Sequence, residues 1–250
     1  MRKILGLVVL VSSLVIFCSP ASAQQTEWKD PAYNFGKTKT VVVMDTKFTY
    51  GGFDVSGNNK FVKYPYGEEK STSMLKSRFG KVTNVLFISF SEVAKKVKAR
   101  ADFPGGSPGS KEFSDFVQSV MPQYADAVLF VEIRDFGWYY EHYAPYDSTE
   151  TKIERVEYGG ITPDGKQYSG WRDVPTTVTV HHDEGYSIYD SAEVDLGLMD
   201  AATWKYVWKY SDSRTRNSYA WGQNYDSSGP ESMIQRIMDD FTEKMPFAPK

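Results

Sequence analysis

The chain has 250 residues, of which 41% are apolar and 24% are charged, and its formal net charge is −3. This composition supports a sizeable core, and it excludes a disordered chain, a collagen-like fibre and a coiled-coil rod. An acidic chain without a basic stripe is also a poor nucleic-acid binder, because Lys and Arg supply most of the affinity for phosphates. Aromatic residues, at 15%, are the one excess.

The first 23 residues have the pattern of a secretory signal peptide. Arg2 and Lys3 form a basic start, residues 4–17 are almost wholly apolar, and Ala21-Ser22-Ala23 is the small-x-small pattern of a signal-peptidase site. We therefore expect cleavage after Ala23 and a mature protein that begins at Gln24. The apolar run is shorter than the roughly 20 residues of a spanning helix, and no later segment approaches that length, so we expect no integral membrane span.

The single cysteine, Cys18, raises the alternative of a lipid anchor. A bacterial lipobox has a small residue just before its cysteine, whereas the bulky Phe17 stands there in this chain. We therefore expect an exported protein that is soluble in the periplasm or outside the cell, rather than a lipoprotein or an uncleaved anchor. Since cleavage removes Cys18, the mature chain has no thiol for catalysis and no disulfide.

Strands and helices follow one another along the first half of the chain. Valines at three successive positions predict a buried strand, and the spacing of Ser89 and Glu92 is that of a helix-capping box. Ser110 is a natural N-cap after a glycine-rich turn. The elements expected here are a strand at 40–48, a helix from 68, a strand at 85–90, a helix from 89, a helix from 110 and a strand at 127–133.

The second half reads mostly as β-structure and ends in a helix. Strands are expected at 152–158, 176–181, 192–199 and 205–210, and a helix is expected from Pro230 until Pro246 stops it. The fold class is therefore α+β, with a single mixed β-sheet packed by helices. Residues 24–250 are expected to form one domain with a β-rich aromatic insertion at about 136–191. The apolar stripes of the Ser110 and Pro230 helices should both face the sheet that holds 41–44 and 128–133.

The hairpin at 194–208 resembles a known family. Its pattern is Val194-x-Leu196-x-Leu198-x-Asp200-Ala201-x-Thr203 followed by Val207-Trp208. This pattern and the order of elements resemble exported bacterial envelope domains related to the amino-terminal domain of TolB and to CsgG-like lipoproteins. The resemblance implies a binding or assembly module of the cell envelope, and it brings no catalytic residue. Trp204 stands where those domains have glycine, which predicts a turn unlike theirs.

One segment matches a hydrolase motif literally. Residues 105–109 read Gly-x-Ser-x-Gly, but a nucleophile elbow follows a strand, and its oxyanion hole uses the backbone N–H of the residue after the serine. Pro108 stands at that position and has no N–H. Because a helix is expected before this segment, we interpret it as a plain turn.

The three histidines are the other chemical candidates. His142, His181 and His182 lie near carboxylates, and zinc could use two imidazoles and a carboxylate. Adjacent residues of a strand point to opposite faces, so His181 and His182 cannot bind one metal without a bulge. We therefore expect no metal and no cofactor.

Aromatic side chains of the insertion are the candidate binding site. Alternating rings on both faces of a strand exceed the needs of one core face, so some should be exposed and contact a protein or a glycan. The alternative is a set of cross-strand aromatic ladders that stabilise a long hairpin. The predicted patch consists of Trp138, Tyr139, Tyr140, Tyr143 and Tyr146.

The sequence thus predicts a non-catalytic exported protein of the cell envelope that binds or assembles with another envelope component, a protein or a glycan. The alternative is a hydrolase or metal-dependent enzyme that uses the histidines of the β-rich block.

Overall fold

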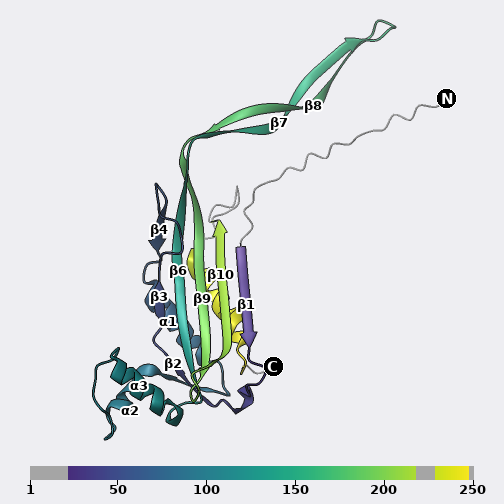
Figure 1. The fold of residues 1–250 in the computed structure, drawn as a ribbon. Helices are drawn as coiled ribbons and strands as arrows, with labels where there is room; N and C mark the ends of the chain where they lie inside the picture. The colour runs from purple at the N-terminus through teal and green to yellow at the C-terminus, as the bar shows by residue number, and fades with distance from the viewer. Residues whose placement is uncertain (1–21, 218–228, 248–250) are drawn as a thin grey trace, which may run out of the picture.

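The computed structural model describes residues 22–217 and 229–247. It contains one large mixed sheet and a separate two-stranded sheet (Figure 1). The strands are β1 (Ser22–Lys29), β2 (Thr40–Val43), β3 (Lys47–Thr49), β4 (Lys60–Lys63), β5 (Leu86–Ser89), β6 (Ala127–Tyr143), β7 (Tyr146–Ile161), β8 (Gln167–His182), β9 (Gly185–Asp200) and β10 (Tyr206–Asn217). The α-helices are α1 (Gly67–Phe79), α2 (Phe90–Lys98), α3 (Lys111–Val120) and α4 (Gly229–Lys244). The expected α+β class is confirmed, whereas most of the expected signal peptide lies outside the described residues.

The large sheet has the strand order β1-β10-β9-β6-β2-β5, with β3 and β4 also paired to β6. β2 is parallel to β5 and β6, whereas β6, β9, β10 and β1 pair with one another in antiparallel fashion. The single strand expected at 40–48 is divided into β2 and β3. Val43 pairs with Leu129, and Lys47 pairs with Glu132. The segment therefore advances by four positions where β6 advances by three, and this extra residue interrupts the pairing between the two strands.

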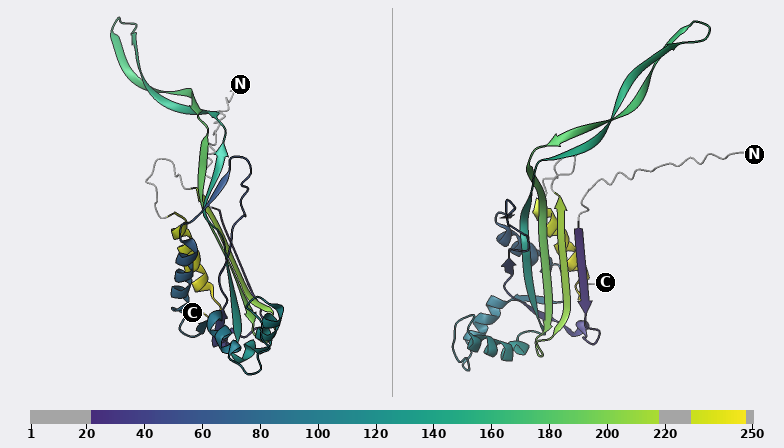
Figure 2. Two further views of the ribbon diagram at one scale, coloured as in Figure 1. Left: turned by 90° about the vertical axis from the view of Figure 1, so that its left-hand side faces the viewer. Right: turned by 45° about the horizontal axis from the view of Figure 1, so that its top comes forward.

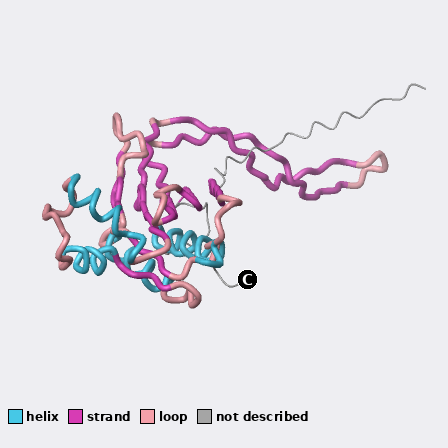
Figure 3. The backbone as a smooth tube through the Cα atoms, turned by 60° about the horizontal axis from the view of Figure 1, so that its bottom comes forward, coloured by secondary structure: helices cyan, strands magenta, loops and turns pink. Residues whose placement is uncertain are grey.

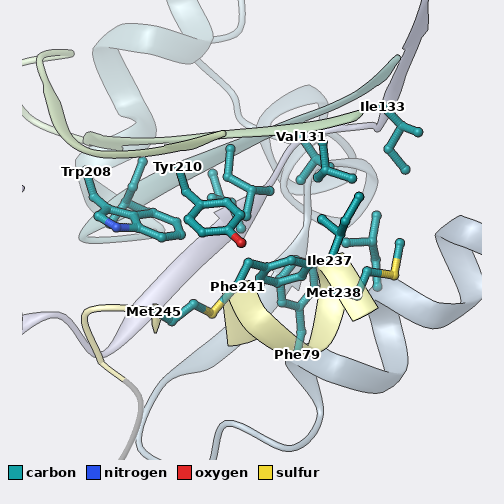
Figure 4. Packing of buried hydrophobic residues seen from close by; sticks show 14 of the residues in the cluster. Phe79, Val131, Ile133, Trp208, Tyr210, Ile237, Met238, Phe241 and Met245 are labelled. Atoms are coloured by element: carbon teal, nitrogen blue, oxygen red, sulfur yellow. The ribbon is translucent and has the colours of Figure 1, made fainter. Parts of the chain in front are cut away.

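Helices α1 and α4 cover one face of the large sheet (Figure 2). The main core lies between them and the sheet, and Ile237, Met238 and Phe241 of α4 are fully buried there. Figure 4 shows Trp208 and Tyr210 pointing from the sheet toward these residues, with Phe79 of α1 below them. The periodic apolar stripe of α4 therefore forms the core, as the sequence predicts.

Helices α2 and α3 pack at one end of the opposite face. Val93 and Val97 of α2 and Val117 of α3 form a second cluster with Val42 and Val128 of the sheet. Both helices begin as expected, because the Ser89 side chain caps α2 in a capping box and the Ser110 side chain accepts from the Phe113 N–H. The α3 and α4 stripes thus both face the sheet, but from its two opposite sides, since neighbouring residues of β2 and β6 point to opposite faces.

A β-bulge in β6 changes which side chains face the main core. The register slips between Arg134 and Gly137, and Asp135 takes a left-handed conformation with φ of 46°. Before the bulge Ile133 faces the core, and after it Phe136 does, because one extra residue inverts the alternation. The Asp135 carboxylate accepts hydrogen bonds from the Gly51 and Gly52 amides at 2.8 and 3.0 Å, which fixes the loop beside the bulge.

Strands β7 and β8 form an arm that projects away from the sheet (Figures 1 and 3). They pair with each other over their full length, from Tyr146 opposite His182 to Ile161 opposite Gln167. The expected insertion at 136–191 is thus divided between two structures. Its two ends lie in β6 and β9, which run across those positions within the large sheet, and only 146–182 forms the separate arm.

Trp204 lies in the turn between β9 and β10, and its φ of 55° is in the left-handed region that glycine favours. The strain of this conformation, about 1–2 kcal/mol, is offset by contacts. The indole ring packs against the second cluster, and its Nε1 donates a hydrogen bond to the Gln118 carbonyl at 3.3 Å.

Candidate functional site

The five residues of the predicted aromatic patch do not share one surface. Trp138 and Tyr140 lie on the side of the β6–β9 ribbon that continues the main core, and Tyr139 and Tyr143 lie on the other side. The cause is the alternation of side chains along a strand. Tyr146 belongs to the arm and follows a break in the strand.

Tyr139 is held by a stack of aromatic rings. Its ring lies 4.5 Å from that of Phe53, which in turn stacks on Phe61 of β4 at 5.7 Å. The loop that carries Phe53 is tied down by the carboxylate of Asp135 at the bulge. These contacts fix the loop between β3 and β4 on the sheet, and they leave Tyr139 half-buried.

Trp138 and Tyr140 are also half-buried in contacts within the chain. The Trp138 ring lies 5.3 Å from that of Tyr64. The Tyr140 ring meets that of Tyr186 edge-on at 6.2 Å, and the Lys60 ammonium lies 4.7 Å from the Tyr140 centroid and 4.8 Å from the Tyr186 centroid. Such cross-strand and cation–π contacts stabilise the ribbon, so they favour the ladder alternative for these residues.

A repeated tyrosine–glycine pairing extends this stabilisation into the arm. Tyr158 is directly opposite Gly170, and Tyr168 is directly opposite Gly160. A Cβ atom at Gly160 would lie 2.8 Å from the Tyr168 hydroxyl, and one at Gly170 would lie 3.1 Å from the Tyr158 ring, so each ring lies across the backbone of the glycine. Tyr143 has the same relation to Gly185 at the base of the arm. These tyrosines supply cross-strand contacts to a ribbon that has no third strand.

The large apolar side chains on the opposite side of the arm have no such cover. Ile153, Ile161 and Trp171 are 73%, 68% and 61% exposed, and their register places all three on the side away from Tyr158 and Tyr168. Trp171 is opposite Glu157, so Ile153 and Ile161 are each four residues from its level, about 13 Å along the strand. We call this set the arm apolar side, and it is the candidate functional site.

Polar groups separate the three apolar side chains. Arg155 and Asp173 form an ion pair at 3.7 Å between Ile153 and Trp171, and Glu157 stands opposite Trp171. An exposed tryptophan and two isoleucines with charged groups among them resemble the composition of a protein–protein contact surface. The sequence signal was present, because Ile153 and Ile161 stand at odd positions of a mostly polar strand, but the predicted patch ended at Tyr146.

The histidines do not converge. His181 Nδ1 lies 2.7 Å from Asp147, His182 Nε2 lies 2.7 Å from the Ser148 hydroxyl on the other side of the arm, and His142 is 3.6 Å from Glu184. The expected opposite orientation of His181 and His182 is thus confirmed. Within residues 22–217 and 229–247, no group of three His, Cys, Asp or Glu side chains is arranged to hold a metal ion.

The Gly-x-Ser-x-Gly segment lies in the loop between α2 and α3. Gly105, Gly106 and Gly109 all have positive φ, and Ser107 is exposed. A helix precedes the segment where a nucleophile elbow has a strand, so the expected turn is confirmed.

A buried charge cluster between β10, β1 and α4 escaped the sequence analysis. Asp212 is fully buried, and its carboxylate accepts hydrogen bonds from Arg214 at 2.7 and 2.9 Å, from the Tyr210 hydroxyl at 3.0 Å and from the Gln25 amide at 3.0 Å. Burial alone would raise the pKa of Asp212, but these hydrogen bonds outweigh it and hold that pKa below its ordinary value. Burial, together with the Asp212 charge, raises the pKa of Tyr210. Arg214 also pairs with Asp240 of α4, so the cluster joins three elements.

No protein-family model matches the sequence, and no curated protein matches it. Among solved structures, a PelC dodecamer from Paraburkholderia phytofirmans matches with a TM-score of 0.42 and 11% identity, covering 92% of this chain and 100% of that one. The lipoprotein GNA1162 from Neisseria meningitidis matches with a TM-score of 0.34 and 11% identity, covering 82% of this chain and 99% of that one. Similarities this low imply nothing about what this chain binds, and the resemblance to TolB and CsgG-like domains stays a prediction. In the part of the chain that the structure describes, no helix has the length and apolarity to cross a membrane.

Proposed function

We propose that this chain is a non-catalytic, exported module of the bacterial cell envelope that binds a protein partner through the arm apolar side. The observation that carries the proposal is the exposure of Ile153, Ile161 and Trp171 on a two-stranded ribbon that projects from the body (Figure 1). An isolated two-stranded ribbon is marginally stable in water, and covering one of its sides removes that deficit. The envelope location rests on the signal-peptide pattern of residues 1–23.

A protein partner suits this surface better than a lipid does. The ion pair of Arg155 with Asp173 and the carboxylate of Glu157 interrupt the apolar side chains, and such charges would be costly within an apolar phase. A protein partner can meet these charges with hydrogen bonds and opposite charges of its own, which the acyl chains of a lipid cannot do. Among the described residues, neither candidate of the enzyme alternative gains support, because the histidines do not converge and Ser107 lies in a plain loop.

Site-specific photo-crosslinking in the native cell envelope tests the proposal. A photo-reactive amino acid in place of Trp171 or of Ile153 should give the same discrete cross-linked protein. The matched control replaces Arg172, which neighbours Trp171 but points to the opposite side of the arm. A Trp171→Ser variant should lose the partner while its melting temperature stays unchanged.

Two results would overturn the proposal. One is the absence of any cross-linked protein from either apolar position, and the other is equal cross-linking from Arg172. Mass spectrometry of the processed chain tests the export step, for which the expected first residue is Gln24. An amino terminus still at Met1, or a lipid on Cys18, would contradict that step.

A further inference from the structure

The face of the large sheet opposite α4 carries a groove that the arm does not touch. Helices α2 and α3 cover only one end of this face (Figure 2), and above them a groove of about 570 Å³ lies over β1, β10, β9, β6 and the segment that leads into β3. We call it the sheet groove. Its lining consists of rows of side chains that run across the strands, because directly paired residues of neighbouring strands share one face.

The first row of the sheet groove is aromatic. Trp28 pairs with Lys209, Lys209 pairs with Gly197, and Gly197 pairs with Phe130, so these positions form a line across four strands. The Tyr206 ring lies over Gly197, where an added Cβ would come within 2.6 Å of it. The Lys209 ammonium sits 4.2 Å from the centroid of the same ring. Trp28 and Tyr206 are 47% and 42% exposed, so two large rings face the groove without being buried.

The second row is polar and lies two residues, about 7 Å, further along the strands. Thr26, Ser211, Asp195, Glu132 and Lys47 occupy successive strands at this level. Two hydroxyl groups are followed along the row by two carboxylates and an ammonium group, and Lys47 and Glu132 form an ion pair at 2.9 Å. This row therefore offers hydrogen-bond donors and acceptors side by side along the whole groove.

Each carboxylate of the second row is paired with a cation. Hydrogen bonds from Thr49 and Lys47 lower the pKa of Glu132, and Asp195 pairs with Arg134. Covering these charges with an apolar protein surface would cost their hydration without replacing it. A ligand rich in hydroxyl groups can replace that hydration, since each hydroxyl both donates and accepts.

The dimensions of the groove call for an elongated ligand. The polar row crosses five strands spaced about 4.8 Å apart and is about 19 Å long, and the aromatic row crosses four strands and is about 14 Å long. Sugar rings have apolar C–H faces that stack on aromatic side chains, and their hydroxyls point outward in the ring plane, which matches an aromatic row beside a polar one. The charges along the groove are balanced, because Lys47 pairs with Glu132 and Arg134 pairs with Asp195, so there is no surplus of positive charge to attract an anionic chain.

We propose that the sheet groove binds a linear, uncharged saccharide chain across the strands, with Trp28 and Tyr206 as stacking platforms. This site is independent of the arm apolar side, so either proposal can fail while the other stands. The Trp28 platform is positioned through its strand, because Gln25 of β1 is bonded to the buried Asp212.

Isothermal titration of the full processed chain with two probes tests the site. The probes are linear hexasaccharides of glucose and of N-acetylglucosamine, and at least one should bind saturably. Trp28→Ala and Tyr206→Ala should each weaken that binding at least tenfold, whereas Trp28→Phe and Tyr206→Phe, which keep a ring, should lose much less. Trp171→Ala of the arm is the matched control and should leave the affinity unchanged. A hexamer of galacturonate should bind more weakly than either neutral probe.

Circular dichroism of each variant separates a lost fold from a lost contact. If a platform variant fails to fold, Gly197→Ala serves instead, because its methyl group displaces the Tyr206 ring from the groove while β9 and β10 stay paired. Absence of saturable binding of both neutral hexasaccharides overturns the proposal, and so does equal affinity in folded platform variants. A protein that binds the wild type and is released by Trp28→Ala, with no saccharide binding, would also overturn it.

Discussion

Replacement of Asp212 by asparagine should be among the most costly single changes of charge in this protein. Asp212 is fully buried and faces Arg214, whose side chain is 20% exposed. Removing one partner of a buried, hydrogen-bonded ion pair costs about 3–5 kcal/mol. Because Asp240 still contacts Arg214 in the variant, we expect the lower end, about 3 kcal/mol, which corresponds to a fall of about 6–12 °C in melting temperature for a chain of this size.

The matched control is Asp240→Asn, which removes the other carboxylate from the same arginine. The Asp240 side chain is 45% exposed, so its pair with Arg214 is worth less than about 1 kcal/mol. Urea unfolding followed by circular dichroism measures both variants. Equal costs for the two variants would refute the argument that burial makes the difference.

The pH dependence of stability has a definite sign at this cluster. The pKa of Asp212 is lower in the folded chain than its ordinary value of about 3.9 in an unfolded one. Its contribution is therefore fully present above that ordinary pKa, and it is lost as the pH falls through the lower folded-state pKa. In the Asp212→Asn variant, the free energy of unfolding should fall less steeply with pH in this acidic range. An unchanged slope of that free energy against pH would contradict the lowered pKa of Asp212.

Two further predictions concern packing. Ile237→Ala should lower the free energy of unfolding by about 2–5 kcal/mol, because Ile237 is fully buried against the sheet. Phe116→Ala should lower it by less, because Phe116 is only half-buried beside the second cluster. Denaturant midpoints compare the two variants, and equal shifts of the midpoint would contradict this difference. Asp135→Ala should leave the Gly51 and Gly52 amides without their acceptor, lower the free energy of unfolding by about 1–3 kcal/mol and speed proteolysis of that loop. Asp135→Asn should have a smaller effect, because asparagine accepts hydrogen bonds and tolerates positive φ. Equal protease resistance in the wild type and in Asp135→Ala would show that the carboxylate does not hold the loop.

Local features of the fold were readable from the sequence because they depend on neighbouring residues. Helix starts at Ser89 and Ser110, the stripe of α4 and the turn at Asp200 each involve residues within a few positions of one another. The bulge also left a trace. Core-facing apolar residues occupy odd positions up to Ile133 and even positions from Phe136, and this change of parity is visible in the sequence once a bulge is considered.

Tertiary structure alone decided which side chains share a surface. Nothing near Trp138 or Tyr139 indicates that rings from the loops on either side of β4 cover them, because those rings come from residues about 75–85 positions away. Likewise, Trp28 and Tyr206 reach one groove only because β1 pairs with β10. Long-range strand pairing sets these neighbours, and the alternation of side chains along each strand then assigns each ring to one face. The sequence by itself determined that the chain has excess aromatic side chains in a β-rich block, and the register of the strands determined which of them remain free to bind.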